Sequence, residues 1–365
     1  MLLVRALTLL LLWVAIACDD AAATGGADAG DGDGAAAGGD GDGGDGGDGD
    51  GTGDGDGSGD GDGDGTGDGD GDGDGDGDGT VGESPSLAGC AIFPADNPWN
   101  TDVSGYPLHA NSDAFIDSIG RTTRLHPDFG TVWDGSPIGI PYTTVGGDQP
   151  RVPVSFQYDD ESDPGPYPIP PGAPVEGGSD RHVLVVDTDA CMLYELFAAE
   201  TSDGGASWSA GSGAVFDLAT GDLRPAGWTS ADAAGLPILP GLVRYDEVVE
   251  QGEIAHALRF TVSRSQTGYI PPATHAAGAS GDASLPPMGL RLRMRADYDC
   301  SGFSDEVQVI CAAMKRYGMF VADNGSDWYV SGAPDGRWSD DNLGDLKQIE
   351  GGAFEVVETG AVVGQ

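Results

Sequence analysis

The sequence predicts a mainly β protein: a β-sandwich or jelly-roll-like single domain, with a β-barrel carrying an appended helix as the alternative. Three observations support this fold class. Short runs rich in β-branched and aromatic residues recur through residues 84–365, with Gly, Pro and Asp clusters between them. Only one segment has complete helix start and stop signals. The 282 residues of this region are also enough to bury one large core.

Eleven runs have the length and composition of strands. In chain order they are 140–145, 152–158, 182–187, 191–200, 213–218, 242–249, 256–262, 290–296, 319–324, 328–332 and 354–359. So many strands beside so few helices favour a sandwich over an α/β architecture.

The segment 304–317 has the pattern of one well-formed helix. Ser304 is a residue type that caps helix N-termini, and Gly318 is one that ends helices. Acidic residues occupy the first turn and basic residues the last, as the helix dipole favours. Shorter helices are expected at 112–119 and 340–346.

Charge divides the chain into two parts. The 365 residues carry a formal net charge of −45. Residues 1–83 hold 22 acidic residues and one basic residue, whereas residues 84–365 hold 39 acidic and 15 basic residues. We expect no nucleic-acid partner, because binding phosphates requires a basic surface and both parts are acidic.

Residues 1–17 have the pattern of an export signal. Arg5 supplies one positive charge before an apolar run that ends at Ala17. This run is too short to span a bilayer and suits a signal peptide.

The end of this run, Ala15-Ile16-Ala17 before Cys18, resembles the lipobox of bacterial lipoproteins. The resemblance implies cleavage before Cys18 and attachment of a lipid to it, although that family most often has leucine where this chain has Ala15. A membrane is then the partner of the chain, and the chain is anchored in the cell envelope outside the cytoplasm. Ordinary secretion fits the same residues and is the alternative.

Residues 18–83 are predicted to form a disordered spacer between the lipid and the domain. Glycine has no side chain to bury and neighbouring aspartates repel each other, so the segment cannot offset its ordering entropy. Part of the tract fits the calcium-loop pattern D-x-D-x-D-G-x5-E, with ligands at Asp72, Asp74, Asp76 and Glu83. However, an alternating Asp-Gly tract matches this pattern by chance, and Gly79 stands where a working loop has a hydrophobic residue. We therefore expect a solvated spacer and no cofactor.

Four cysteines follow Cys18, and their spacing is too wide for a C-x-x-C metal site. They are Cys90, Cys191, Cys300 and Cys311. An even number in an exported chain predicts two disulfides. We favour Cys90–Cys191, which would tie down the chain where it enters the domain, and Cys300–Cys311, which would pin the main helix to the preceding strand. Free buried thiols are the alternative.

The predicted strand 290–296 places Arg291, Arg293 and Arg295 on one face. We interpret them as a cationic stripe for an anionic ligand such as a uronic-acid glycan. A solvated face paired with carboxylates of neighbouring strands is the alternative.

Glu195 is the first candidate catalytic residue. It shares a strand face with Leu193 and Phe197, and apolar surroundings raise the pKa of a carboxyl, which suits a general acid. Glycoside hydrolysis requires a second carboxylate. The candidates for it are Asp232, Asp246 and Glu247. A structural salt bridge of Glu195 is the alternative.

His256 is the second candidate catalytic residue, as a base with Tyr269 as its acid. With arginines neutralising a carboxylate, this pair has the chemistry of a polysaccharide lyase. His182 and His275 are weaker candidates, and a buried structural role of His256 is the alternative.

Tryptophans in or beside loops add a hint of sugar binding, because an indole ring can stack on a sugar ring. They are Trp99, Trp133, Trp208, Trp228, Trp328 and Trp338. The sequence therefore predicts a surface-anchored bacterial lipoprotein whose β-rich domain acts on extracellular polysaccharide, as a hydrolase or a lyase. A non-catalytic glycan-binding or adhesion domain is the alternative.

Overall fold

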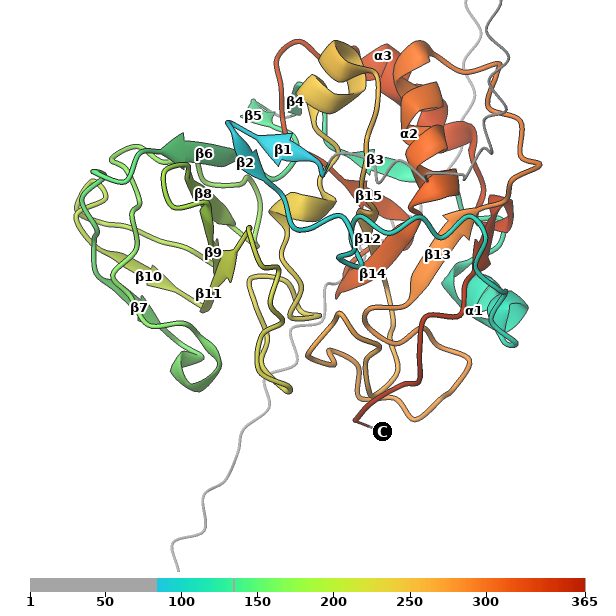
Figure 1. Cartoon of the computed structure of the whole chain (residues 1–365), viewed down its shortest axis with the longest axis horizontal. Helices are drawn as coiled ribbons and strands as arrows, with labels where there is room; N and C mark the ends of the chain where they lie inside the picture. Colours follow the sequence, from blue (N-terminus) through green and yellow to red (C-terminus); the bar gives the residue numbers. More distant parts are fainter. Residues whose placement is uncertain (1–83, 134, 365) are drawn as a thin grey trace, which may run out of the picture. The chain divides into compact units, whose positions relative to one another are not determined.

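The computed structural model describes residues 84–133 and 135–364 (Figure 1). The predicted signal segment, Cys18 and the calcium-loop positions lie outside these residues. The described part consists mainly of strands in several sheets with few helices, which confirms the predicted mainly β class. No sheet in these ranges closes into the barrel of the alternative prediction.

The larger sheet has six strands in the order β16-β13-β14-β12-β15-β3 (Figure 1). Their bounds are His126–Asp128 (β3), Leu258–Val262 (β12), Arg291–Met294 (β13), Met319–Asn324 (β14), Tyr329–Ser331 (β15) and Phe354–Val356 (β16). The sheet is mixed: β12 runs parallel to β14, and β13 runs antiparallel to it. Thr261 of β12 is in register with Asp323 of β14, so both lie where these two parallel strands end.

The second sheet has four strands in the order β11-β9-β8-β6 (Figure 1). Their bounds are Tyr142–Val145 (β6), Val183–Asp187 (β8), Met192–Phe197 (β9) and Ser212–Asp217 (β11). Strand β8 is buried on both faces, which explains its unbroken apolar sequence. Leu184 and Val186 join the main core with the six-stranded sheet, whereas Val183 and Val185 face a second, smaller core.

Three two-stranded sheets complete the strands. They pair β1 (Ser86–Leu87) with β2 (Cys90–Ala91), β4 (Val132–Trp133) with β5 (Ser136–Pro137), and β7 (Val154–Phe156) with β10 (Trp208–Ala210). The second core lies between β10 and the four-stranded sheet, where Tyr167, Ile169 and Trp208 are buried.

Helix α2 (Asp305–Arg316) confirms the predicted main helix, and it buries Val307, Ile310, Cys311, Ala313 and Met314. Ser304 stands at the N-cap position, but its hydroxyl donates to the carbonyl of Asn342 instead of capping the helix. The two shorter predicted helices correspond to α1 (Ser112–Ile119) and α3 (Asp340–Leu343). Short 3-10 turns lie at Asp159–Glu161, Leu239–Gly241, Gly344–Gln348 and Gly351–Ala353.

The strand expected at 242–249 is wrong, because a π-helical turn, Asp246–Gln251, begins halfway along it. Arg244 pairs with Glu247 across 2.7 Å, and this spacing of three residues brings two side chains together only on a helical turn. Gly252, with a φ of 72°, adopts the left-handed conformation that ends the turn.

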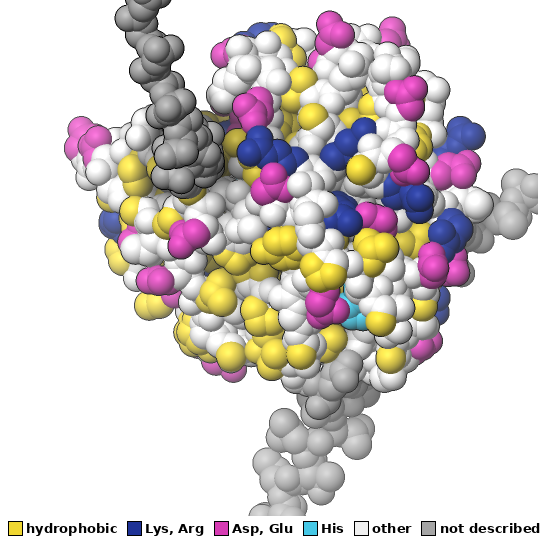
Figure 2. Space-filling model, turned by 45° about the vertical axis from the view of Figure 1, so that its right-hand side comes forward, with side chains coloured by type: hydrophobic (Ala, Val, Ile, Leu, Met, Phe, Trp, Pro, Cys, Tyr) yellow, Lys and Arg dark blue, Asp and Glu magenta, His cyan; other side chains and the backbone are white. Residues whose placement is uncertain are grey.

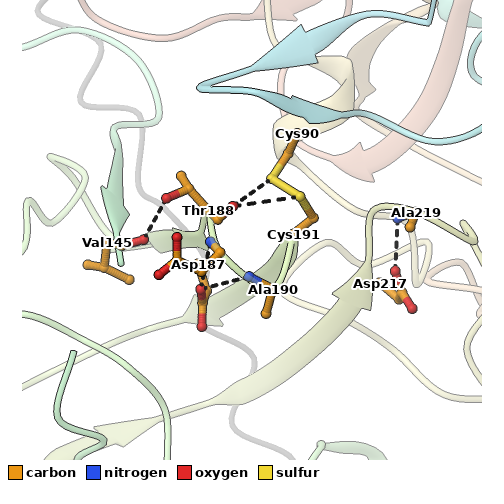
Figure 3. The surroundings of a disulfide bond; sticks show 9 residues. Cys90, Val145, Asp187, Thr188, Ala190, Cys191, Asp217 and Ala219 are labelled. Atoms are coloured by element: carbon orange, nitrogen blue, oxygen red, sulfur yellow. Dashed lines mark hydrogen bonds between the residues drawn. A yellow bond between two sulfur atoms is a disulfide. The ribbon is translucent and has the colours of Figure 1, made fainter. Parts of the chain in front are cut away.

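Both predicted disulfides are formed. Cys90 of β2 is joined to Cys191 in the turn between β8 and β9, beside the carbonyl of Thr188 (Figure 3). Cys300, in the loop after β13, is joined to Cys311 in the middle of α2. Within the described residues, no helix has the length and apolar character needed to cross a membrane.

Candidate active site

Two neighbouring pockets are lined by several acidic side chains. The Trp133 pocket has a volume of about 440 Å³, and its lining includes Asp128, Trp133, Glu176, Ser179 and Asp180. The Asp323 pocket has a volume of about 250 Å³, and its lining includes Asp180, Ser212, Ser230, Asp232 and Asp323. Because Asp180 lines both pockets, a ligand in one lies beside the other.

The carboxylates of these pockets come from separate parts of the chain. Asp128 ends β3, and Asp323 lies near the end of β14. Glu176 and Asp180 belong to the loop that leads into β8, and Asp232 belongs to the long loop after β11. The fold therefore brings together acidic residues that no short sequence motif contains.

Asp232 and Arg259 form a buried ion pair at the base of the Asp323 pocket. Arg259 donates to both oxygens of Asp232, over 2.8 Å from Nη2 and 3.2 Å from Nε, and its Nη1 donates to the hydroxyl of Ser331. Burial alone would lower the pKa of Arg259, but the Asp232 carboxylate raises it above its usual value. Arg259 therefore retains its positive charge.

Asp323 carries a proton near neutral pH. Burial and the neighbouring Asp232 carboxylate raise the pKa of Asp323 to about 8, although its carboxyl also accepts from the backbone N–H groups of Asn324 and Ala233. A protonated carboxyl that lines a pocket is a proton donor in position to meet a ligand.

Glu176 and His182 form a second pair at the Trp133 pocket. The His182 Nδ1 lies 2.5 Å from the Glu176 carboxylate, and its Nε2 lies 3.0 Å from the carbonyl of Ala231. Burial would lower the pKa of His182, but Glu176 raises it above its usual value. Burial, Glu176 and Asp180 also raise the pKa of Asp128. The pocket is thus lined by acidic side chains, one of which, Glu176, is paired with the buried His182.

Glu195 is fully buried and lines neither pocket. Its carboxyl accepts from the backbone N–H groups of Ile238 and Leu239 over 2.9 to 3.0 Å. Burial raises its pKa to about 7, with the nearby Asp232 charge contributing, so the predicted raised pKa of Glu195 is confirmed. This carboxyl therefore holds the backbone at 238–239 in place and does not face a pocket.

His256 is also fully buried, and its ring nitrogens lie 2.8 Å from the carbonyl of Ala257 and 3.1 Å from Glu247. Among the described residues, no hydrogen bond or ring contact joins it to Tyr269. Tyr269 lies apart, in backbone bridges to Met288 and Val363. The structure therefore does not bring the predicted base and acid together.

Asp246, predicted as a partner of Glu195, lies 3.4 Å from Arg244 and lines a third pocket. Glu247 pairs with Arg244 and His256. Burial would raise the pKa of Glu247, but His256 and Arg244 lower it below its usual value. Of the predicted second carboxylates, only Asp232 lines the Asp323 pocket.

The three arginines of the predicted cationic stripe have different surroundings. Arg291 and Arg293 belong to β13, and Arg295 follows it. Arg291 is buried, and its donors contact the carbonyls of Pro98, Thr101 and Tyr317. Arg293 pairs with Glu355 and donates to three carbonyls of residues 103–106. Only Arg295 is exposed, beside Asp297. Basic groups also mostly adjoin acidic ones on the face drawn in Figure 2.

No family model, curated protein or solved structure matches this chain. The described residues contain no group of three or more His, Cys, Asp or Glu side chains arranged to hold a metal ion.

Four acidic residues of the pockets were missed by the sequence analysis: Asp128, Glu176, Asp180 and Asp323. The sequence does contain one signal that could have indicated Asp323 and its neighbour Arg259. Arg259 and Asp323 interrupt apolar runs, "ALRF" and "MFVAD", and a charged group in a buried strand requires a partner. The other three lie in turns or at a strand end, where acidic residues are common.

Proposed function

We propose that the domain hydrolyses extracellular polysaccharide. The observation that carries this proposal is the protonated carboxyl of Asp323, which lines a pocket together with a second carboxylate, Asp180. Cleaving a glycosidic bond requires a carboxylic acid that protonates the leaving oxygen and a carboxylate on the other side of the sugar. In this proposal Asp323 is the acid and Asp180 is the base or nucleophile.

Asp232 and Arg259 are positioning residues in this proposal. The ion pair holds the Asp232 carboxylate in place beside Asp323. A second charge beside Asp232 is unfavourable, so Asp323 retains its proton at a pH where an ordinary aspartate has lost it. In this proposal the pair keeps Asp323 protonated and does not itself contact the substrate.

A sugar as substrate is supported by Trp133, whose side chain is 76 % exposed in the hairpin of β4 and β5. Its ring offers a stacking surface at the Trp133 pocket, and the surrounding carboxylates accept hydrogen bonds from hydroxyl groups. Hydrolysis is favoured over the lyase reaction, because a lyase base at His256 would have to act from a fully buried position.

We also propose that the domain lies outside the cytoplasm, attached to a membrane. Cys18 carries the lipid, and the Asp-Gly tract to residue 83 holds the domain away from the membrane. A long polar tract after a lipid anchor suits an enzyme that acts on a polymer outside its own membrane.

The full chain is the protein to test, by incubation with neutral and acidic polysaccharides while polymer size is followed by gel filtration. We expect one polymer to shorten with the wild type. Asp323→Asn and Asp180→Asn should each reduce the rate at least a hundredfold, since general acid–base groups contribute factors of about 10² to 10⁴. Asp341→Asn, an exposed aspartate at the start of α3, is the matched control. If no polymer shortens, the hydrolase proposal fails.

A non-catalytic glycan-binding domain is the second candidate, and the burial and pairing of both Glu195 and His256 favour it. In that case a polymer should co-elute with the chain at full length. Asp323→Asn should then leave binding unchanged, whereas Trp133→Ala should weaken it.

A further inference from the structure

A third pocket, the Arg244 pocket, shares no lining residue with the other two. It has a volume of about 290 Å³, and its lining includes Tyr142, Arg244, Tyr245, Asp246, Asp335 and Arg337. These residues come from the start of β6, the segment before and within the π-helical turn, and the loop after β15. Nothing in the proposed hydrolytic mechanism uses them.

Arg244 is the buried member of this pocket, with only 1 % of its side chain exposed. Its Nη2 donates to Glu247 over 2.7 Å, and its Nε lies 3.4 Å from Asp246. Its Nη1 has no hydrogen-bond partner among the described residues. A buried donor without an acceptor is unfavourable, so the structure leaves a place for an acceptor that arrives from the pocket.

The charges of the pocket wall are already balanced. Arg337 pairs with Asp335, and Arg244 pairs with Asp246. A bound anion would gain the contact to Arg244 but would face Asp246 and Asp335. An uncharged hydroxyl group meets no such repulsion, because its oxygen can accept from Arg244 while its hydrogen is donated to a carboxylate.

Two tyrosines provide the apolar part of the pocket. Tyr142 is half-buried at the start of β6, and Tyr245 packs edge-on against Trp338 with Arg337 above its ring at 4.1 Å. Aromatic walls with a few polar groups are the usual composition of small-molecule sites. The volume lies at the lower end for such sites, which suits one ring rather than a long segment of chain.

We propose that the Arg244 pocket binds one uncharged, hydroxyl-rich ring, the chemistry of a neutral monosaccharide unit. Arg244 donates to a ring hydroxyl, Asp246 and Asp335 accept from others, and Tyr142 contacts the C–H face. The choice of a sugar rests on the proposed function, but the site itself does not. It would serve as a second point of attachment to the same polymer.

The test is an NMR titration of the full chain with labelled tyrosine and tryptophan side chains. Methyl glycosides of neutral hexoses, glucuronate and inorganic phosphate are added separately. We expect the Tyr142 and Tyr245 signals to shift with a neutral glycoside. We expect Arg244→Lys, which keeps the charge beside Glu247 but lacks Nη1, to weaken binding at least tenfold.

Asp335→Asn keeps the inference testable if Arg244→Lys does not fold, and it should weaken binding by a similar factor. Asp341→Asn is again the control and should bind like the wild type. Shifts with phosphate or glucuronate alone would overturn the inference, as would no shift with any probe. The Trp133 indole signal reports ligand binding at the Trp133 pocket, and the Tyr142 signal reports binding at the Arg244 pocket. The two proposals can therefore fail independently of each other.

Discussion

Asp232 accepts two hydrogen bonds from Arg259, and both side chains are buried. The pair joins the loop after β11 to the middle of the six-stranded sheet. It also places the Asp232 carboxylate beside Asp323, whose pKa that carboxylate helps to raise. One ion pair therefore links the stability of the fold to the chemistry of the Asp323 pocket.

Replacing Arg259 with methionine should lower the free energy of unfolding by about 3 to 5 kcal/mol, because it leaves Asp232 buried and unpaired. The double variant Arg259→Met with Asp232→Leu should lose much less than the sum of the single changes. Urea denaturation measures all of these values. Arg295→Met is the control, because Arg295 is exposed, and it should change stability little.

Asp323 should make the protein less stable as the pH rises. Its folded pKa of about 8 lies above the ordinary value of 3.8, so between these values the folded protein holds a proton that the unfolded chain has lost. The stabilisation of the folded state by this proton is complete below pH 4 and is lost as the pH rises through 8. The change in the free energy of unfolding is about 1.4 kcal/mol for each unit of pKa difference. Urea midpoints between pH 4 and 9 should depend less on pH in Asp323→Asn than in the wild type.

Glu195→Gln should also make stability depend less on pH, but over a narrower pH range than Asp323→Asn. The folded pKa of Glu195 is about 7 against 4.5, so its contribution is complete below 4.5 and is lost as the pH rises through 7. Glutamine retains one oxygen to accept from Ile238 and Leu239, so the variant should fold. An unchanged slope between pH 5 and 7 would argue against the raised pKa.

The two disulfides should differ in their contributions to stability. Cys90 and Cys191 are 101 residues apart, whereas Cys300 and Cys311 are 11 apart. In the chain-entropy model, closing the longer loop stabilises the fold by about 2 kcal/mol more. Replacing each pair with alanine and comparing urea midpoints tests this order, and equal losses would contradict the entropic explanation.

Cys18→Ser should release the protein from membranes. If Cys18 carries the lipid, the wild type partitions into the detergent phase and the variant into the aqueous phase, because the spacer itself is polar. Mass spectrometry of the mature N-terminus provides the second readout. A wild-type chain without added acyl mass would indicate ordinary secretion.

The strands were the most predictable part of the fold, because alternation and β-branched runs reflect burial directly. "HVLVVD" became β8, and "CMLYELFAAE" became β9, which ends at Phe197; most side chains of both strands are buried. The error at 242–249 arose because Leu242, Val243 and Val248 gave the segment the composition of a strand. The decisive interaction there, Arg244 with Glu247, is visible only once both side chains are known to be buried.

The site was far less predictable, because its members lie in loops and at strand ends from residue 128 to residue 323. Sequence patterning predicted that Glu195 is surrounded by apolar side chains and that its pKa is raised. It did not predict that Glu195 lines neither pocket while Asp323 lines one of them. Which acidic residues meet depends on how β3, β14 and two long loops pack together, and that is a property of tertiary structure.

The Cys90–Cys191 disulfide also determines where a mechanical load would enter the domain. A pull along the chain from its N-terminal side can peel the short β1–β2 pair but then reaches Cys90. From there the covalent bridge passes the load to Cys191, at the turn between the buried strands β8 and β9. The intervening hundred or so residues, including Trp133, Glu176 and Asp180, would bear no tension, so a tethered domain under drag would keep that side of its pockets intact.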